Sequence, residues 1–181
     1  LASAATGSAF EPGEAQRRFV AWWKNGAYSP TGRCFDIGIT TRQALSRFEE
    51  TGDPIAGSDD PYSAGNGSLM RLAPVAIWGI REDPAVMVRV ARRQSMTTHA
   101  ADACLDACEA YALVLRPAIL GADLEESLAQ ARGTYGTEIG PIMAGSWRGK
   151  KRDQIPSSGF VAHSLEAAIW SVANTASFDD A

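Results

Sequence analysis

The sequence predicts an all-α fold in which several helices of moderate length pack around a shared core. Apolar residues recur every three to four positions in segment after segment, and no stretch alternates convincingly between apolar and polar residues as a half-buried strand would. Helix start signals (aspartate, threonine, proline) precede these segments, and glycine often follows them. We therefore predict a multi-helix bundle that forms one domain over residues 1–181.

The first two predicted helices cover residues 12–25 and about 40–51. The first ends at Gly26, a residue type that suits the left-handed position just past a helix. The second has Thr40 as its candidate N-cap and Gly52 as its stop. Two adjacent tryptophans in the first helix are interpreted as core packing rather than as a platform for a ligand.

A long loop is predicted before the next helix. Residues 53–67 are rich in glycine, proline, serine and aspartate, a composition typical of loops. A helix from about Ser68 to Ile80 follows, and Pro74 either lies near its start or kinks it. The next helix, residues 84–96, has an aspartate before it and a proline in its first position.

The second half of the chain has three further predicted helices. Residues 97–121 are small and apolar over most of a helical circumference, which is typical of a helix buried among others. A short exposed helix within residues 123–132 is capped by its first aspartate. Residues 133–159 have no periodicity and contain the basic run "RGKKR", so we predict a solvated surface loop, followed by an amphipathic helix at residues 163–175.

The composition is that of a soluble globular protein and argues against several functional classes. The chain is 45% hydrophobic and 21% charged. Its net charge of −4 argues against a nucleic-acid partner. No apolar run is long enough to span a membrane, and no signal-peptide pattern opens the chain. Three cysteines do not form a disulfide framework, so we expect buried thiols and a cytoplasmic location.

Both ends suggest a piece of a longer protein. The chain begins at Leu1 rather than at a methionine. It stops in "TASFDDA", where Ser177 or Asp179 looks like a helix start with no helix after it. We therefore expect the single domain over residues 1–181 to be incomplete at both ends.

One of the two histidines has acidic residues at helical spacing. His99, Asp102 and Asp106 would share one face if His99 opens a helix. This face could hold a metal ion or orient an imidazole through a carboxylate. The spacing alone favours the alternative, in which Asp102 is a first-turn acidic residue and His99 a side chain of the capping region.

Two loop features are also candidates for a site. Asp36, in "GRCFDIGITTR", either forms a turn or accepts a hydrogen bond in a site. The Gly65–Asn66–Gly67 turn is either a tight corner or a seat for a phosphate at a helix N-terminus. It is no P-loop, because the Lys-Ser/Thr ending is missing, and the chain has no nucleophile elbow for acyl transfer.

The chain contains three stretches that stand out: "TGRCFDIGITTRQAL", "AGNGSLMRLAPVA" and "SMTTHAADACLDAC". In their residues, order and spacing they resemble the ADP-ribosylglycohydrolase family, which includes the dinitrogenase-reductase-activating glycohydrolases. A fourth, "SGFVAHSLEAAIWSVANTASFDDA", is similar to the helix before the family's last metal motif. The resemblance runs from about Phe19 to Ala181. It implies a multi-helix orthogonal bundle of the ADP-ribosylglycohydrolase type, around a cleft that holds ADP-ribose.

The resemblance implies a hydrolase that cleaves the glycosidic bond of ADP-ribosylated protein or of a related ADP-ribose conjugate. The leaving group stays open between arginine, serine, a nucleobase and a small metabolite. The family uses a water activated by Mg²⁺, a hard cation that takes carboxylates and keeps water, and two such ions are expected. The family's acidic metal motifs would lie before Leu1 and after Ala181, so no metal ligand is assigned within the chain, and residues 1–181 alone are expected to be inactive.

The resemblance also assigns residues. Asp36 matches the aspartate of the family's "DIG" motif and is the catalytic candidate. The expected substrate-binding residues are Gly65, Asn66, Gly67, Ser68, Met70, Thr98, His99, Gly159 and Phe160. Ile39 stands where many members have asparagine, and Phe160 where many have tyrosine, which bears on substrate preference.

Two other functions remain as alternatives. One is a non-catalytic helical module that binds ADP-ribose. The other is an unrelated helical interaction domain, in which the glycine-asparagine turn and His99 would lie far apart. The resemblance predicts instead that Asp36, Asn66 and His99 converge on one cleft.

Overall fold

The computed structural model of the chain describes residues 10–177 and 179–180, and over this range the all-α prediction is confirmed. No strand occurs among these residues, where backbone pairing outside helices and turns is limited to two isolated bridges. The α-helices are α1 (Pro12–Asn25), α2 (Ile39–Thr51), α3 (Gly67–Met70), α4 (Ala73–Gly79), α5 (Pro84–Met96), α6 (Asp102–Ile119), α7 (Leu124–Gln130), α8 (Gly140–Met143) and α9 (Val161–Asn174). Leu1 and Ala181, on which the expectation of an incomplete domain partly rests, lie outside the described residues.

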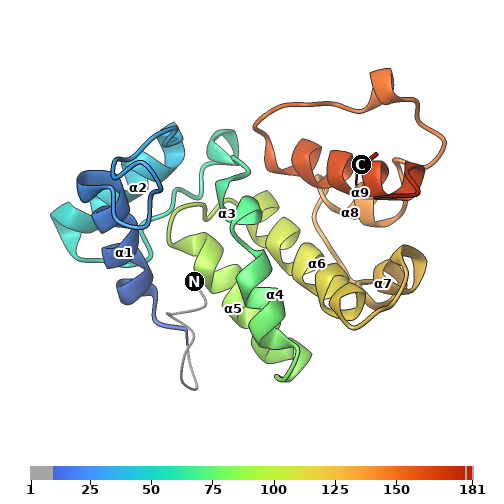
Figure 1. Ribbon diagram of the computed structural model, residues 1–181, viewed down its shortest axis with the longest axis horizontal. Coiled ribbons are helices and arrows are strands. Elements are labelled where there is room, and N and C mark those ends of the chain that lie inside the picture. Colours follow the sequence, from blue (N-terminus) through green and yellow to red (C-terminus); the bar gives the residue numbers. More distant parts are fainter. Residues whose placement is uncertain (1–9, 178, 181) are drawn as a thin grey trace.

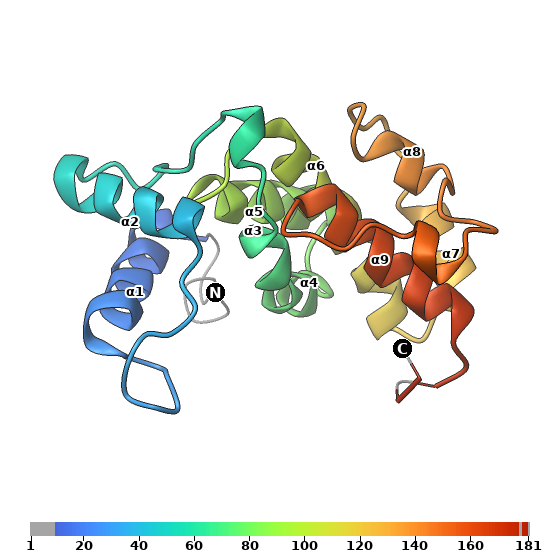
Figure 2. The ribbon, with the colours of Figure 1, turned by 90° about the horizontal axis from the view of Figure 1, so that it is seen from above.

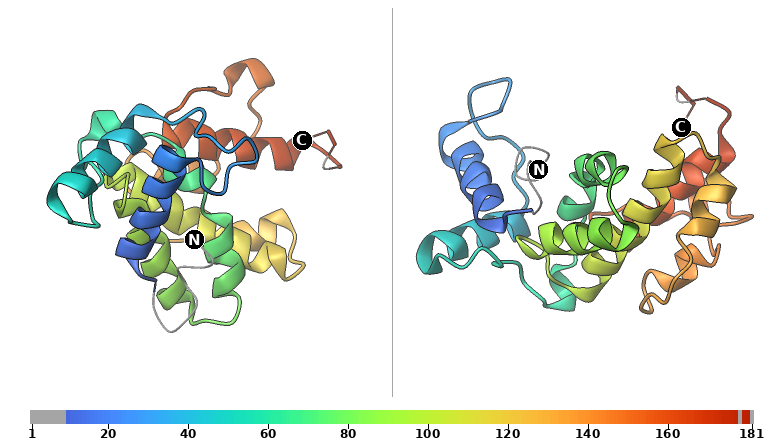
Figure 3. Two further views of the ribbon diagram at one scale, coloured as in Figure 1. Left: turned by 60° about the vertical axis from the view of Figure 1, so that its left-hand side comes forward. Right: turned by 90° about the horizontal axis from the view of Figure 1, so that it is seen from below.

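Helix α6 is the centre of the arrangement and packs against α3, α4, α5, α7 and α9. Helices α1 and α2 contact each other at one end of the molecule, and α7, α8 and α9 lie at the other (Figures 1 and 2). The other views show α4, α5 and α6 between these two ends (Figure 3). The small apolar composition that predicted a buried helix therefore corresponds to the most surrounded helix of the fold.

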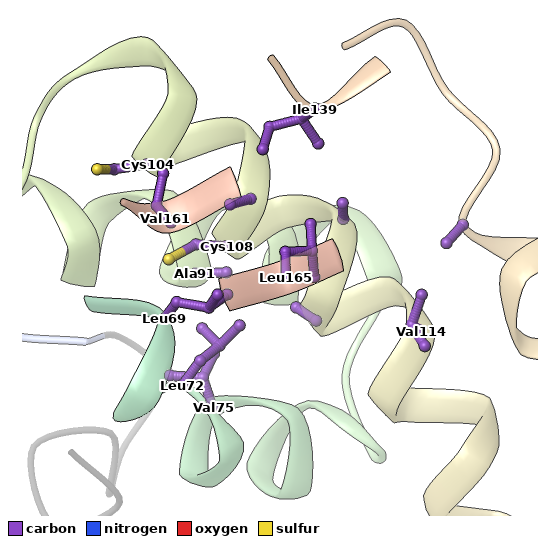
Figure 4. Packing of buried hydrophobic residues seen from close by; sticks show 14 of the residues in the cluster. Leu69, Leu72, Val75, Ala91, Cys104, Cys108, Val114, Ile139, Val161 and Leu165 are labelled. Carbon is purple, nitrogen blue, oxygen red and sulfur yellow. The ribbon is translucent and has the colours of Figure 1, made fainter. Parts of the chain in front are cut away.

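The core forms where α4, α5, α6 and α9 meet. Leu72, just before α4, is fully buried, and so is Leu165 from α9. Figure 4 shows both in the same core cluster as Cys104 and Cys108, the two thiols on α6. Both cysteines are fully buried and free, as the sequence predicted, and burial raises the pKa of each thiol.

Helix α2 begins before the predicted cap. Gly38, not Thr40, is the N-cap residue, and its carbonyl accepts a hydrogen bond from the Arg42 N–H at 3.0 Å. This bond closes the first helical turn two residues earlier than a threonine cap would, so the cap prediction was wrong. The C-terminal prediction is confirmed, because Gly52 adopts a left-handed φ of 75°.

The helix predicted over about residues 68–80 is two helices. Helix α3 ends at Met70 and α4 begins at Ala73, with Pro74 in the first turn of α4. Proline has no N–H to donate to the carbonyl four residues earlier, and its ring clashes with that carbonyl. Helix α3 is consequently one turn long, too short for a substantial helix dipole.

His99 lies in the connection between α5 and α6 and opens neither helix. Its N–H donates to the Ser95 carbonyl at 2.7 Å, and it forms an isolated bridge with Ser58. Helix α6 begins only at Asp102. A His99–Asp102–Asp106 helical face therefore does not exist, because only the two aspartates are helical. Asp102 is an acidic residue in the first turn of α6, as the favoured interpretation had it.

The segment predicted as an irregular loop, residues 133–159, contains α8 and a 3₁₀ helix at Arg152–Gln154. Part of its basic run is anchored rather than solvated, because Lys150 pairs with Glu166, a nearly buried carboxylate of α9. Helix α9 begins at Val161, two residues before the predicted start.

Candidate functional site

A cleft of about 560 Å³ opens between α1, the start of α2, the turn before α3 and the turn before α9. Three of its lining residues are Asp36, Asn66 and His99, which lie far apart in the sequence. The structure therefore brings together the three residues that the resemblance placed on one cleft. Gly65, Gly67, Met70 and Gly159 line it as well.

The Gly65–Asn66–Gly67 turn is held from the α9 side. The Asn66 N–H donates to the Gly159 carbonyl at 2.9 Å, and its side-chain Nδ2 donates to Ser164 Oγ at 2.8 Å. Gly65 also forms an isolated antiparallel bridge with Phe160. The Asn66 side chain thereby has a fixed orientation at the cleft wall.

Glycine is needed at position 67 for space and not for backbone freedom. Neither Gly65 nor Gly67 has a positive φ. A Cβ at Gly67 would lie 2.9 Å from His99 Cε1 and 3.4 Å from Thr41 Oγ1. Any side chain at this position therefore has to displace the His99 ring.

His99 is an uncharged imidazole at neutral pH. Its side chain is almost completely buried, and burial, helped by the nearby Arg71 guanidinium, lowers the pKa of His99 to about 4. Thr98 Oγ1 lies 2.7 Å from His99 Nδ1 and fixes the ring, whose Nε2 is the nitrogen nearer to Gly65 and Gly67. A neutral imidazole can donate or accept a hydrogen bond without adding charge to the cleft.

Asp36 is an exposed carboxylate on a residue with a left-handed backbone conformation. Its φ is 52°, a conformation that aspartate tolerates better than most residues. Among the described residues, no donor forms a hydrogen bond with its carboxylate, so both oxygens are available to the cleft.

Three of the predicted substrate-binding residues do not line the cleft. Ser68 is fully buried, and its Oγ accepts a hydrogen bond from Ser95 Oγ at 2.8 Å. Thr98 is fully buried behind His99. Phe160 packs edge-on against His163, with the ring centroids 5.1 Å apart. Their places in the fold support the turn and the imidazole rather than a direct contact.

Sequence reasoning missed other cleft residues. Phe19 and Trp22 of α1 form part of the wall, although the tryptophan was interpreted as core packing. Arg71 also lines the cleft and directly follows Met70, the last predicted substrate-binding residue of the stretch "AGNGSLMRLAPVA". The adjacent tryptophans at positions 22 and 23 stand out in the sequence, and Arg71 lies within a quoted motif, but neither pattern by itself indicated a position in the cleft.

Within residues 10–177 and 179–180, no three histidine, cysteine or acidic side chains are close enough to hold a metal ion. Asp106 instead accepts hydrogen bonds from Arg92 Nη1 at 3.1 Å and from the Gly136 N–H at 2.8 Å. No helix in this part of the chain combines the length and apolar character needed to cross a membrane.

Comparisons with known proteins point to one family. The sequence model of a family described as ADP-ribosylglycohydrolase matches residues 1–181. A protein of Pseudomonas putida (strain GB-1) named ADP-ribosylarginine hydrolase Tri1 is 44% identical over 162 residues, which cover 90% of this chain and 43% of that protein. A protein of the same name from Serratia proteamaculans (strain 568) is 37% identical over 166 residues, covering 92% of this chain and 45% of that protein.

A solved structure is similar over nearly the whole chain. It is described as an ADP-ribosylglycohydrolase-related protein complex, and it matches with a TM-score of 0.80 and 31% sequence identity. The match covers 99% of this chain and 58% of that chain. The chain thus spans less than half the length of the two curated relatives and somewhat more than half of the solved structure.

Proposed function

Because this chain belongs to the ADP-ribosylglycohydrolase family, we propose that the protein hydrolyses the glycosidic bond between ADP-ribose and an arginine side chain. Arginine is chosen as the leaving group because both relatives described above are named ADP-ribosylarginine hydrolases. The observation that carries the proposal is the convergence of Asp36, Asn66 and His99 on one cleft from three distant segments.

These residues have the chemistry needed to bind a sugar hydroxyl, or to activate a water, beside the charged ADP-ribose. Asp36 can accept a proton from a hydroxyl or from the attacking water, a contribution of about 10²- to 10⁴-fold when the geometry is right. Asn66 uses its Nδ2 in the bond to Ser164, so its Oδ1 is free to accept a hydrogen bond from a ligand hydroxyl. His99 and the close approach at Gly67 define the neighbouring wall.

Glycoside cleavage needs a second acid–base group or a metal ion, and the described cleft has only one carboxylate, that of Asp36. Mg²⁺ prefers an octahedron of oxygen ligands that includes carboxylates, so the described residues alone do not fit it. We propose that the two Mg²⁺ ions expected for the family are held mainly by the part of the relatives' length that this chain does not span. Bound there, they would supply an activated water.

Residues 1–181 expressed alone are therefore expected to give no stoichiometric Mg²⁺ binding in isothermal titration calorimetry. The physical reason is the missing cluster of oxygen ligands in the described cleft. Circular dichroism would verify that the polypeptide is helical, and the full-length protein is the positive control. A tight one- or two-site isotherm from the short polypeptide would contradict the proposal.

The test of the function is release of free ADP-ribose from defined substrates by the full-length protein. A peptide ADP-ribosylated on arginine and a matched peptide modified on serine would be compared by chromatography. We expect rapid release from arginine and slow release from serine. Release from serine alone would refute the choice of leaving group, and ADP-ribose binding without release would favour the non-catalytic module.

A further inference from the structure

Arg71 follows α3 and turns its guanidinium inward rather than to solvent. Nε donates to Gln94 Oε1 at 2.9 Å, and Nη2 donates to the Gln94 carbonyl at 2.9 Å. Nη2 also lies 3.2 Å from Thr97 Oγ1. The guanidinium plane is thereby fixed against the last turn of α5.

The charge of this guanidinium has no counter-ion. Among the described residues, no carboxylate lies within ion-pair distance of Arg71. The Phe19 ring covers it at 5.0 Å, and burial lowers the pKa of Arg71 to about 10, so the group stays protonated at neutral pH. The C-terminus of α5 offsets roughly half a charge at most. A net positive charge therefore remains in a poorly solvated place.

Part of the guanidinium is also without hydrogen-bond partners. Arg71 lines the cleft, and its Nη1 donates to no acceptor in the described part of the chain. Two N–H donors thus remain on a rigid, positively charged group at the wall that His99 and Gly67 share. Charges that are largely removed from water are normally paired in proteins, and the partly exposed Arg71 has no charged partner among the described residues. An anionic ligand group in the cleft would supply one.

We propose that Arg71 is an anion-binding residue of the cleft and contacts a phosphate oxygen of the bound ADP-ribose. The identity of the ligand rests on the proposed function, whereas the need for an anion rests on the geometry of Arg71. Guanidinium is well matched to phosphate, because its planar donors form strong charge-assisted hydrogen bonds. Gln94 and Thr97 hold the plane in place, so little side-chain freedom is lost on binding.

The test uses the full-length protein with Arg71→Gln, and Arg116→Gln as the matched control. Arg116 also donates to backbone carbonyls near a helix end, those of Gly79 and Ile80, but it does not line the cleft. Binding of ADP-ribose and of inorganic pyrophosphate would be measured by calorimetry at several NaCl concentrations. We expect Arg71→Gln to weaken ADP-ribose by about 10- to 100-fold and to flatten the salt dependence. Arg116→Gln should change neither.

Other results with the Arg71 variants would overturn the proposal or the proposed function. If Arg71→Gln only lowers the melting temperature and leaves affinity and salt dependence unchanged, Arg71 is a structural cap and the proposal fails. If Arg71→Gln does not fold, Arg71→Lys is used instead, because lysine keeps the positive charge. The salt dependence of ADP-ribose binding to Arg71→Lys is expected to equal that of the wild type. A flatter salt dependence would overturn the proposal. If the wild-type protein does not hydrolyse ADP-ribosylarginine but binds pyrophosphate, and Arg71→Gln loses that binding, the proposed function is refuted and the anion site is retained. Binding of neither ligand by the wild type would refute both.

Discussion

Asp36→Asn is expected to slow the release of ADP-ribose from an ADP-ribosylarginine peptide by about 10²- to 10⁴-fold. Asparagine has the same shape as aspartate but cannot take a proton from a hydroxyl or a water at neutral pH. The carboxylate is exposed in the cleft and has no hydrogen-bond donor among the described residues. No other described carboxylate lines the cleft to replace it.

The same substitution is expected to leave the fold unchanged. Position 36 has a φ of 52°, and asparagine adopts this left-handed conformation as readily as aspartate. Thermal unfolding should therefore give a melting temperature close to that of the wild type. Initial rates at saturating and at low substrate would separate a loss in kcat from a loss in KM.

Asp53→Asn is the matched control for this experiment. The Asp53 side chain accepts a hydrogen bond from the Ile55 N–H at 2.9 Å, in a turn that does not line the cleft. It should retain nearly full activity. An Asp36→Asn protein with a rate within a few-fold of wild type would show that Asp36 is only a turn residue.

Gly67→Val is expected to lower the affinity for ADP-ribose by orders of magnitude while the protein still folds. The first carbon of the new side chain would lie 2.9 Å from His99 Cε1 and 3.2 Å from Nε2, so the ring has to move. Thr98 holds that ring through a 2.7 Å contact at Nδ1, which the movement would break. The valine would also occupy space in the cleft itself.

The loss of stability and the loss of affinity expected for Gly67→Val differ in size. Overpacking of this kind costs about 1–3 kcal/mol of stability, which lowers the melting temperature of a chain of this size by several degrees. Losing two hydrogen bonds to charged ligand groups, at about 1.5–3 kcal/mol each, weakens binding by roughly 10²- to 10⁴-fold. Calorimetry on the folded protein and a thermal scan would measure these two quantities independently.

Gly79→Val is the control for general destabilisation. A Cβ there would meet the Met87 side chain inside the core, away from the cleft. We expect a lower melting temperature with normal affinity in the folded fraction. If Gly67→Val behaved in the same way, position 67 would be a corner of the fold without a role in binding.

Local sequence patterns were sufficient for most helices. Asp83 before Pro84 marked the start of α5, and its side chain accepts a hydrogen bond from the Ala85 N–H as a cap should. Gly26 and Gly52 marked two helix ends, and both adopt left-handed conformations. These signals work because capping and backbone strain act over a few neighbouring residues.

The errors fell where distant contacts decide the backbone. His99 was placed at the opening of a helix because the residues after it are helical, but it pairs with Ser58 and α6 begins only at Asp102. The four-residue helix α8 lies in a segment without periodicity, where the buried Ile142 and Trp147 pack into the shared core. No local pattern reports such contacts.

By itself, the sequence determined the helical class, several helix boundaries and, through its motifs, the family and the three residues that meet in the cleft. Only the tertiary structure decided which of the predicted site residues line the cleft. It turned Ser68 and Thr98 inward as supports, and it left the Arg71 charge beside the cleft without a partner. Helix propensity and capping depend on adjacent residues, whereas side-chain burial and pairing depend on segments that meet only after the chain has folded.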